Sequence, residues 1–318
     1  MITLEHVYVL MGLMLAGVAW LGAKDKTNRR RYYNALFWGI YATTFLVGSY
    51  LPDIVNGSLV LVMIVLAGSG RLSAGTPRTT SQDEREASAA HWRNRLFLFA
   101  LIVPVATVIG ALTLKHIHIH DAPLVETKNA TLIALALAML LALVILVPKT
   151  RAPLAAPFQE ARRLFDAVGW AAVLPQALAA LGALFAAAGV GQIIATLARD
   201  WIAIDQPFVV VMTYTVGMAL FTMIMGNAFA AFPVMTAGIG LPLIVIHYGG
   251  DPAIMAAIGM LSGFCGTLMT PMAANFNIVP TALLELPDQN AVIKVQIPTA
   301  LILLAANTLL MYFLVFRF

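Results

Sequence analysis

The stretch Met225-Gly226-Asn227-Ala228-Phe229-Ala230-Ala231-Phe232-Pro233 interrupts an almost wholly apolar run from Thr222 to Pro280. A second interruption, Ser262-Gly263-Phe264-Cys265-Gly266-Thr267-Leu268-Met269-Thr270-Pro271, follows in the same run and leads to Asn275-Phe276-Asn277. Glycine weakens a helix and proline removes a backbone donor, so each interruption predicts a broken helix. Broken backbone is tolerated at membrane depth only inside protein or against a polar cavity, and secondary transporters build sites from such helices.

The composition predicts a membrane protein. Of 318 residues, 61% are hydrophobic and only 11% are charged, whereas soluble domains carry roughly 25% charged residues. Such a chain cannot cover itself with polar surface, so its outer surface must face lipid. The net charge of +4 lies in loops and indicates orientation, not binding of nucleic acid. Cys265 is the only cysteine, which excludes an internal disulfide.

The pattern of apolar runs predicts an all-α, polytopic transmembrane helix bundle of about ten segments. The apolar runs cover residues 4–23, 34–51, 54–67, 96–114, 131–147, 170–192, 208–225, 237–246, 253–268 and 299–316. We expect a five-span bundle over residues 1–150. A C-terminal half over residues 151–318 is expected to contain discontinuous or re-entrant helices, so the number of full spans there is left open.

Basic residues predict the orientation in the membrane. They cluster at Lys24–Arg31, within Arg71–Arg95 and at Lys149–Arg163. The positive-inside rule places all three clusters in the cytoplasm and the N-terminus on the outer side of the membrane. We expect this membrane to be the inner (cytoplasmic) membrane. Within the second cluster, Ser81-Gln82-Asp83-Glu84 fits a capping box and predicts a short helix, with a solvated linker as the alternative.

Three further segments are informative, and two of them allow alternative interpretations. In a strand, His116, His118 and His120 share a face, whereas in a helix His116 and His120 share one, and either arrangement suits Zn²⁺ or Cu²⁺. A polar interface at the outer end of a span is the simpler interpretation, because one local cluster lacks a separate anchoring ligand. The mixture of apolar and basic residues over 158–168 predicts a helix lying in the membrane interface. Around Gly189 and Gly191 the chain forms either the tip of a re-entrant hairpin or a site of close helix packing.

Several strings together resemble one known family over nearly the whole chain. They are Leu4-Glu5-His6-Val7-Tyr8, Lys24-Asp25-Lys26-Thr27-Asn28, Asn34-Ala35-Leu36-Phe37-Trp38-Gly39, Leu174-Pro175-Gln176, Ala183-Leu184-Phe185-Ala186-Ala187-Ala188-Gly189-Val190-Gly191 and Met225-Gly226-Asn227-Ala228-Phe229-Ala230. The chain resembles the larger membrane subunit of the two-subunit 5-oxoproline (pyroglutamate) transporter, formerly a domain of unknown function and grouped with the ion-transporter superfamily. The resemblance implies a smaller membrane subunit as partner and 5-oxoproline as substrate.

The two interruptions supply the candidate substrate-binding residues. Asn side chains both donate to and accept from a lactam, and half-helix N-termini attract a carboxylate. No Lys or Arg lies between Arg199 and Lys294, which suits such a site. The candidates are Gly226, Asn227, Gly266, Thr267, Thr270, Asn275 and Asn277. The alternative is that these Asn and Thr side chains only satisfy backbone groups freed at the breaks.

The predicted function is therefore a subunit of a secondary carrier for a small organic anion. We expect no cofactor beyond a coupling Na⁺ or H⁺. The residues near segment ends that could bind H⁺ are Asp200, Asp205, Asp251, Glu285 and His247. The carbonyls freed at Gly226 and Gly266 could instead coordinate Na⁺. The alternative is a membrane scaffold that stabilises a transporting partner. No enzyme activity is expected, since no nucleophile with a nearby base is evident at membrane depth.

Overall fold

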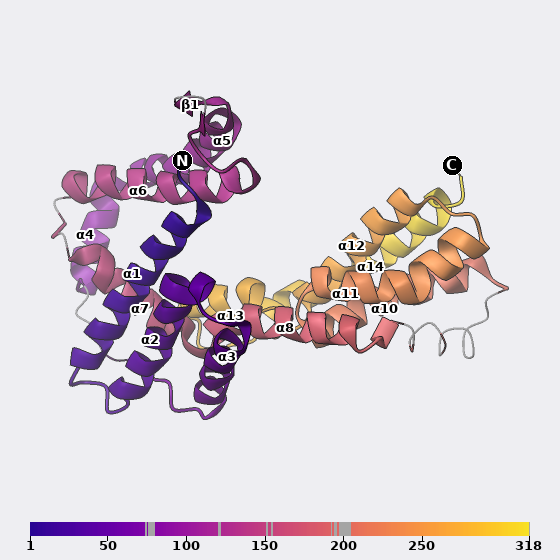
Figure 1. Ribbon diagram of the computed structural model, residues 1–318, viewed down its shortest axis with the longest axis horizontal. Helices are drawn as coiled ribbons and strands as arrows, with labels where there is room; N and C mark the ends of the chain where they lie inside the picture. The colour runs from indigo at the N-terminus through magenta and orange to yellow at the C-terminus, as the bar shows by residue number, and fades with distance from the viewer. Residues whose placement is uncertain are drawn as a thin grey trace. The chain divides into compact units, whose positions relative to one another are not determined.

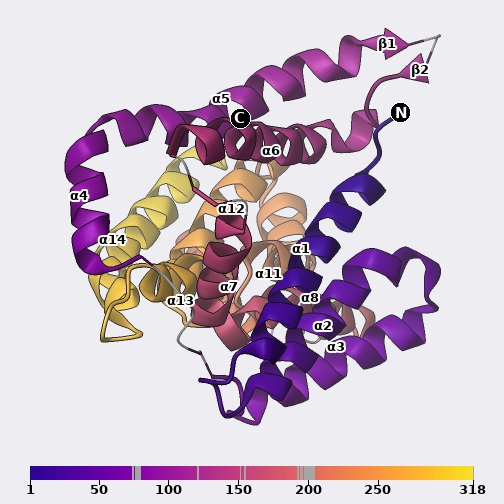
Figure 2. The same cartoon turned by 90° about the vertical axis from the view of Figure 1, so that its left-hand side faces the viewer.

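The computed structural model describes residues 1–73, 75, 80–119, 122–150, 152–153, 155–191, 193, 196 and 205–317. Nearly all regular structure in this part of the chain is α-helical. The described residues form two compact units, an N-terminal unit (Met1–Gly169) and a C-terminal unit (Trp170–Phe318). Each is described by itself below (Figures 1 and 2). The predicted division at residue 150 stays a prediction.

The N-terminal unit is built from helical hairpins. Its helices are α1 (Leu4–Lys24), α2 (Arg31–Val47), α3 (Asp53–Gly68), α4 (Gln82–Trp92), α5 (Arg95–Thr113), α6 (Ala130–Thr150) and α7 (Ala156–Val168), with short 3₁₀ turns η1 (Gly48–Tyr50), η2 (Leu114–His116) and η3 (Thr127–Asn129). The hairpin strands β1 (His118–Ile119) and β2 (Ala122–Pro123) pair antiparallel. Helix α1 packs on α2 and α7, and α5 packs on α6 (Figure 2).

The capping box predicted at Ser81 is confirmed. The Ser81 hydroxyl accepts from the Glu84 N–H at 3.2 Å, and the Glu84 carboxylate accepts from the Ser81 N–H at 2.9 Å. These two bonds satisfy free donors at the start of α4, so the helix forms although it has no apolar face to bury. The linker alternative is therefore excluded for residues 82–92.

The C-terminal unit contains the broken helices. Its elements are η4 (Gly169–Val173), α8 (Leu174–Ala187), α10 (Pro207–Met225), α11 (Ala228–Met235), the π-helical segment η5 (Thr236–His247), α12 (Pro252–Leu268), α13 (Ala274–Leu283) and α14 (Ala291–Leu314). Helices α10, α12 and α14 pack on one another, and α11 packs on α10, α12 and α8 (Figure 1). The expected second-half interruptions are present between α10 and α11 and between α12 and α13.

The core of the C-terminal unit forms around Tyr214 on α10, whose side chain is fully buried. Its ring lies against Gly240 and Gly259, where any Cβ atom would overlap it. The Tyr214 hydroxyl is 3.1 Å from Oγ1 of Thr236, so the one polar atom of this side chain has a partner. Small residues thus allow η5 and α12 to approach α10 closely, as in membrane helix packing.

Seven helical runs among the described residues are long and apolar enough to cross a bilayer. They are Leu4–Lys24, Arg95–His116, Thr127–Thr150, Ala156–Phe185, Pro207–Met225, Ala228–His247 and Ala291–Leu314. Two shorter apolar helices, Asp53–Gly68 and Pro252–Leu268, have 16 and 17 residues, below the roughly 20 residues that a bilayer core requires. These runs support a membrane protein, while the predicted total of about ten segments stays a prediction.

Candidate functional site

The first break is held open by a left-handed glycine. Helix α10 ends at Met225, and Gly226 follows with φ +67°. A Cβ atom at this position would overlap the backbone of Met272 and the side chain of Leu178. Glycine is therefore required here both by its φ value and by the close approach of the chain.

Asn227 begins the next helix. Its Oδ1 accepts a hydrogen bond of 2.8 Å from the Phe229 N–H and caps the N-terminus of α11. Only the oxygen of the carboxamide serves as the cap, so the amide nitrogen remains a donor that a ligand can use. The prediction that a helix stops near Gly226 and restarts before Pro233 is confirmed.

The second break is organised by two buried side chains. Asn277 on α13 donates from Nδ2 to the carbonyls of Thr267 and Thr270, at 2.7 and 2.6 Å. The Thr270 hydroxyl donates to the Met223 carbonyl at 2.8 Å, which ties the end of α12 to the end of α10. Thr270 and Asn277 thus satisfy carbonyls freed at helix ends, as the alternative interpretation of these residues expects.

Both breaks border one cavity of about 220 Å³ in the C-terminal unit. Its described lining residues are Pro175, Leu178, Gly226, Asn227, Ala228, Phe229, Phe264, Thr267, Met272, Ala273, Ala274, Asn275 and Phe276. None of these residues is charged. The first residues of α11 and α13, Ala228 and Ala274, both belong to this lining, so the positive ends of two helices meet at the cavity.

The structure brings four of the seven sequence-predicted residues to this cavity: Gly226, Asn227, Thr267 and Asn275. Thr270 and Asn277 lie buried behind it. Gly266 lies inside α12, where a Cβ atom would overlap the Ala219 backbone of α10. Its carbonyl accepts a hydrogen bond of 3.1 Å from the Met269 N–H. Helix α12 continues through this glycine to Leu268, and Gly266 allows α12 to pack closely on α10.

The acidic residues considered for ion coupling lie at element ends. Asp251 caps α12, since its Oδ1 accepts from the Ala253 and Ile254 N–H groups at 2.8 Å each. Asp205 precedes α10, and Glu285 follows α13 with φ +53°. Asp200 lies outside the described residues.

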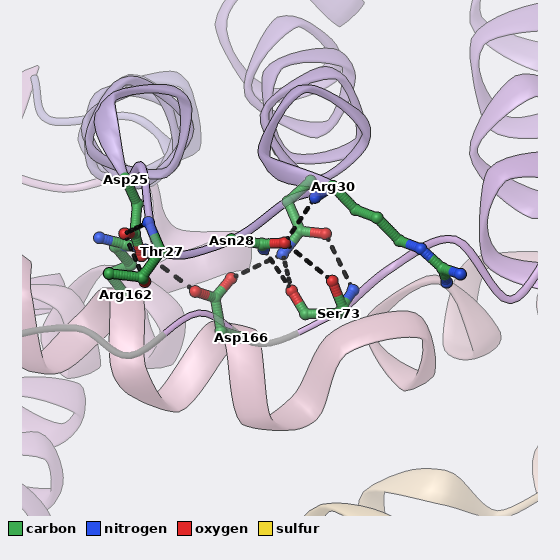
Figure 3. Close-up of polar contacts among 8 residues, drawn as sticks. Asp25, Thr27, Asn28, Arg30, Ser73, Arg162 and Asp166 are labelled. Carbon is green, nitrogen blue, oxygen red and sulfur yellow. Dashed lines mark hydrogen bonds and ion pairs between the residues drawn. The ribbon is translucent and has the colours of Figure 1, made fainter.

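A buried charged cluster lies instead in the N-terminal unit, as Figure 3 shows. Arg162 on α7 pairs through Nη2 with Asp25, which follows α1, and lies 3.5 Å through Nε from Asp166, one turn further along α7. The side chains of Asp25, Arg162 and Asp166 are only 7%, 10% and 4% exposed. Arg162 is therefore buried against two carboxylates, while the prediction that residues 158–168 lie in the membrane interface stays a prediction.

Neutral side chains close the cluster on its other side (Figure 3). Asn28 and Asn34 both donate from Nδ2 to the Ser73 carbonyl at 2.7 Å, and the Ser73 hydroxyl donates to Oδ1 of Asn28 at 2.9 Å. Asn34 also donates to Oδ1 of Asp166 at 3.3 Å. The cluster, which we call the Arg162 cluster, thus joins the end of α1, the start of α2, the segment after α3, and α7.

Comparison with known proteins places the chain in a family. A family model described as "Protein of unknown function (DUF979)" matches residues 5–316. The chain belongs to this family. No curated protein and no solved structure shows significant similarity to it. The DUF979 match covers both helix breaks, the cavity and the Arg162 cluster, but its description assigns them no function.

The histidine motif gives no metal site among the residues that the structure describes. His116 and His118 are exposed, and Nδ1 of His118 lies 3.0 Å from the His116 carbonyl. No group of three or more His, Cys, Asp or Glu side chains arranged to hold a metal is present in the described part of the chain. His120 lies outside it, so the metal interpretation of this DUF979 segment stays untested.

Sequence reasoning missed the Arg162 cluster. One signal was available, because Arg162 and Asp166 stand four residues apart and an i,i+4 pair of opposite charge shares a helix face. The partner across the fold, Asp25, is 137 residues from Arg162, and local spacing gives no information about such a contact.

Proposed function

We propose that this DUF979 protein is a subunit of a secondary membrane transporter for a small organic anion, with 5-oxoproline as the substrate. The observation that supports this most is the meeting of two broken helices at one uncharged cavity in the C-terminal unit, whose mainly apolar lining includes Asn227, Thr267 and Asn275. A helix bundle that only fills the membrane gains nothing from two interruptions at the same place. Discontinuous helices around a cavity are the usual way in which secondary carriers form a substrate site.

The chemistry of the cavity suits a compact anion with an amide. Its volume of about 220 Å³ is below the roughly 300–1,000 Å³ of pockets for drug-sized ligands. A carboxylate is stabilised by the N-terminal ends of α11 and α13 without a basic side chain. The Asn227 amide nitrogen and the Asn275 carboxamide can donate to and accept from the lactam.

We propose that a smaller membrane subunit completes the carrier. Carriers with inverted repeats place matching breaks in both halves of the structure, whereas both strong breaks of this chain lie in its C-terminal unit. The region around Gly189 is a weak counterpart. There, Gly189 has the φ value of a chain turn, +69°, and a Cβ on Gly191 would lie 3.2 Å from the Val234 carbonyl oxygen, so this region combines a turn with close packing.

We place the carrier in the inner membrane, with the N-terminus outside and the three basic clusters in the cytoplasm. Lys24 at the end of α1, and Arg29 and Arg30 after it, are exposed, and the positive-inside rule assigns such a basic cluster to the cytoplasm. Coupling to a cation supplies the driving force for uptake of an anion against the membrane potential.

Uptake of labelled 5-oxoproline into proteoliposomes tests the proposal. We expect uptake by the two subunits together, driven by an imposed Na⁺ or proton gradient, and little or none by either subunit alone. Labelled proline is the matched control, because it shares the ring and carboxylate but lacks the lactam oxygen. Uptake by the smaller subunit alone at the rate of the pair would favour the scaffold role for this chain. Full uptake by this chain alone would refute the two-subunit carrier.

A further inference from the structure

Counted over the residues that the structure describes, the Arg162 cluster is unbalanced in charge. Two carboxylates, those of Asp25 and Asp166, share one guanidinium, and all three side chains are at least nine-tenths buried. The remaining members, Asn28, Asn34 and Ser73, are neutral. With both acids ionised the cluster carries a net charge of −1, and a buried charge without a counter-charge is costly.

The two acids are held very differently. Asp25 accepts from the Thr27 N–H at 2.9 Å and from the Thr27 hydroxyl at 2.6 Å, and it also pairs with Arg162. Asp166 has a long contact of 3.5 Å to Arg162, a long hydrogen bond of 3.3 Å from Asn34 and a further side-chain hydrogen bond from Trp38. Among the described residues, its Oδ2 has no hydrogen-bond donor. The excess negative charge therefore falls on Asp166.

Four other basic groups near the cluster, among the described residues, have partners elsewhere. Lys24, at the end of α1, lies over the Trp20 ring. Arg30 donates to the Gly70 carbonyl at 2.6 Å, and Arg71 donates to the Tyr33 hydroxyl at 3.1 Å. Arg163, next to Arg162 on α7, pairs with Glu160 at 2.8 Å. None of these bonds brings a second positive charge to Asp166.

We propose that Asp166 is a proton-binding site, and that the ion coupled to transport is H⁺. A proton taken from the aqueous phase adds to Oδ2 of Asp166, which brings the net charge of the cluster from −1 to zero. Asp25 keeps its charge and its pair with Arg162 in both states. The assignment of H⁺ as the coupled ion rests on the transport function proposed above, whereas proton binding at Asp166 does not.

Infrared difference spectra of the purified protein in lipid, recorded as a function of pH, test the site without any transport assay. We expect a protonated-carboxyl band that grows as the pH is lowered. Asp166→Asn should abolish this band, and Asp166→Glu should retain a band at a shifted frequency. Asp288→Asn, which alters an exposed carboxylate paired with Lys294, is the matched control and should leave the band unchanged.

The charge imbalance within the Arg162 cluster can be tested separately. Asp25→Asn leaves one guanidinium for one carboxylate, so the midpoint of the Asp166 band should move to lower pH by about one unit or more. An unchanged midpoint in a folded Asp25→Asn protein would overturn the imbalance as the cause. Absence of any Asp166 band down to the pH at which the wild-type protein unfolds would overturn the proton site itself.

The uptake assay then separates the two proposals. If Asp166 shows its band and the reconstituted pair transports nothing, the proton site holds and the transport function fails. If uptake follows a Na⁺ gradient and ignores a proton gradient, the coupling assignment fails while the transport function holds. Uptake that follows a proton gradient and loses that dependence in Asp166→Asn supports both.

Discussion

Asn227 has two separable roles in the structure, and substitutions can divide them. Its Oδ1 caps α11, while its amide nitrogen is available to a ligand at the cavity. Asn227→Ala removes both roles. Asn227→Ser retains a capping oxygen, because serine and asparagine are nearly equivalent N-caps, but it loses the carboxamide. The serine variant therefore isolates the contribution to binding.

The expected magnitudes follow from these contacts. Loss of the cap in Asn227→Ala should lower the free energy of unfolding by about 1 kcal/mol. Loss of a hydrogen-bonding partner for the bound lactam costs about 1–3 kcal/mol, which corresponds to roughly 5- to 150-fold in affinity. Asn227→Ser should therefore weaken 5-oxoproline uptake by this factor while its stability stays within a few tenths of a kcal/mol.

The assay is concentration-dependent uptake by the reconstituted pair, together with thermal unfolding of the detergent-solubilised protein. Asn290→Ser, in the exposed loop before α14, is the control and should alter neither quantity. Asn227→Asp keeps the cap but places a negative charge beside the substrate carboxylate, so its uptake should fall at least as far as that of the serine variant. Normal uptake by Asn227→Ser would refute a ligand role for the carboxamide and leave capping as its only role.

Three further predictions concern packing, pH and topology. Gly266→Ala places a methyl group against the α10 backbone and should lower the free energy of unfolding by about 1–3 kcal/mol. The control Gly57→Ala on α3 meets open space and should not destabilise the protein. Equal effects of the two substitutions in thermal unfolding would contradict this prediction. Burial opposes ionisation of Asp25, but hydrogen bonds from Thr27 and Arg162 outweigh it and lower the pKa of this carboxyl. Its contribution to stability is therefore complete above about pH 4 and is lost as the pH falls through the lower folded pKa. The stability difference between wild type and Asp25→Asn should therefore shrink in strong acid; a difference that stays constant there would refute the assignment. In a cysteine-free background, a cysteine at Ala155 should resist an impermeant label in intact cells and one at Asp53 should react; the opposite pattern would invert the topology.

The sequence by itself determined the fold class, the positions of the helix breaks and the membrane setting. These depend on local chemistry: long apolar runs must form helices in lipid, and Gly226 with Pro233 predicts a stop and restart that the structure shows at Met225 and Ala228. The same local logic predicted the capping box at Ser81, because its partner stands three residues away. Local chemistry also predicted the four of the seven candidate site residues that line the cavity, because they lie at or beside the breaks.

Only the tertiary structure decided what each polar side chain does. Gly266, Asn277 and Asn227 all lie in the run from Thr222 to Pro280. Gly266 nevertheless serves helix packing, and Asn277 donates hydrogen bonds to carbonyls freed at a helix end. The Arg162 cluster depends on contacts between α1, α2 and α7 that span more than 130 residues of chain. Whether Arg162 faces lipid headgroups or two buried carboxylates is set by which helices pack together, and residue spacing along one helix carries no information about that choice.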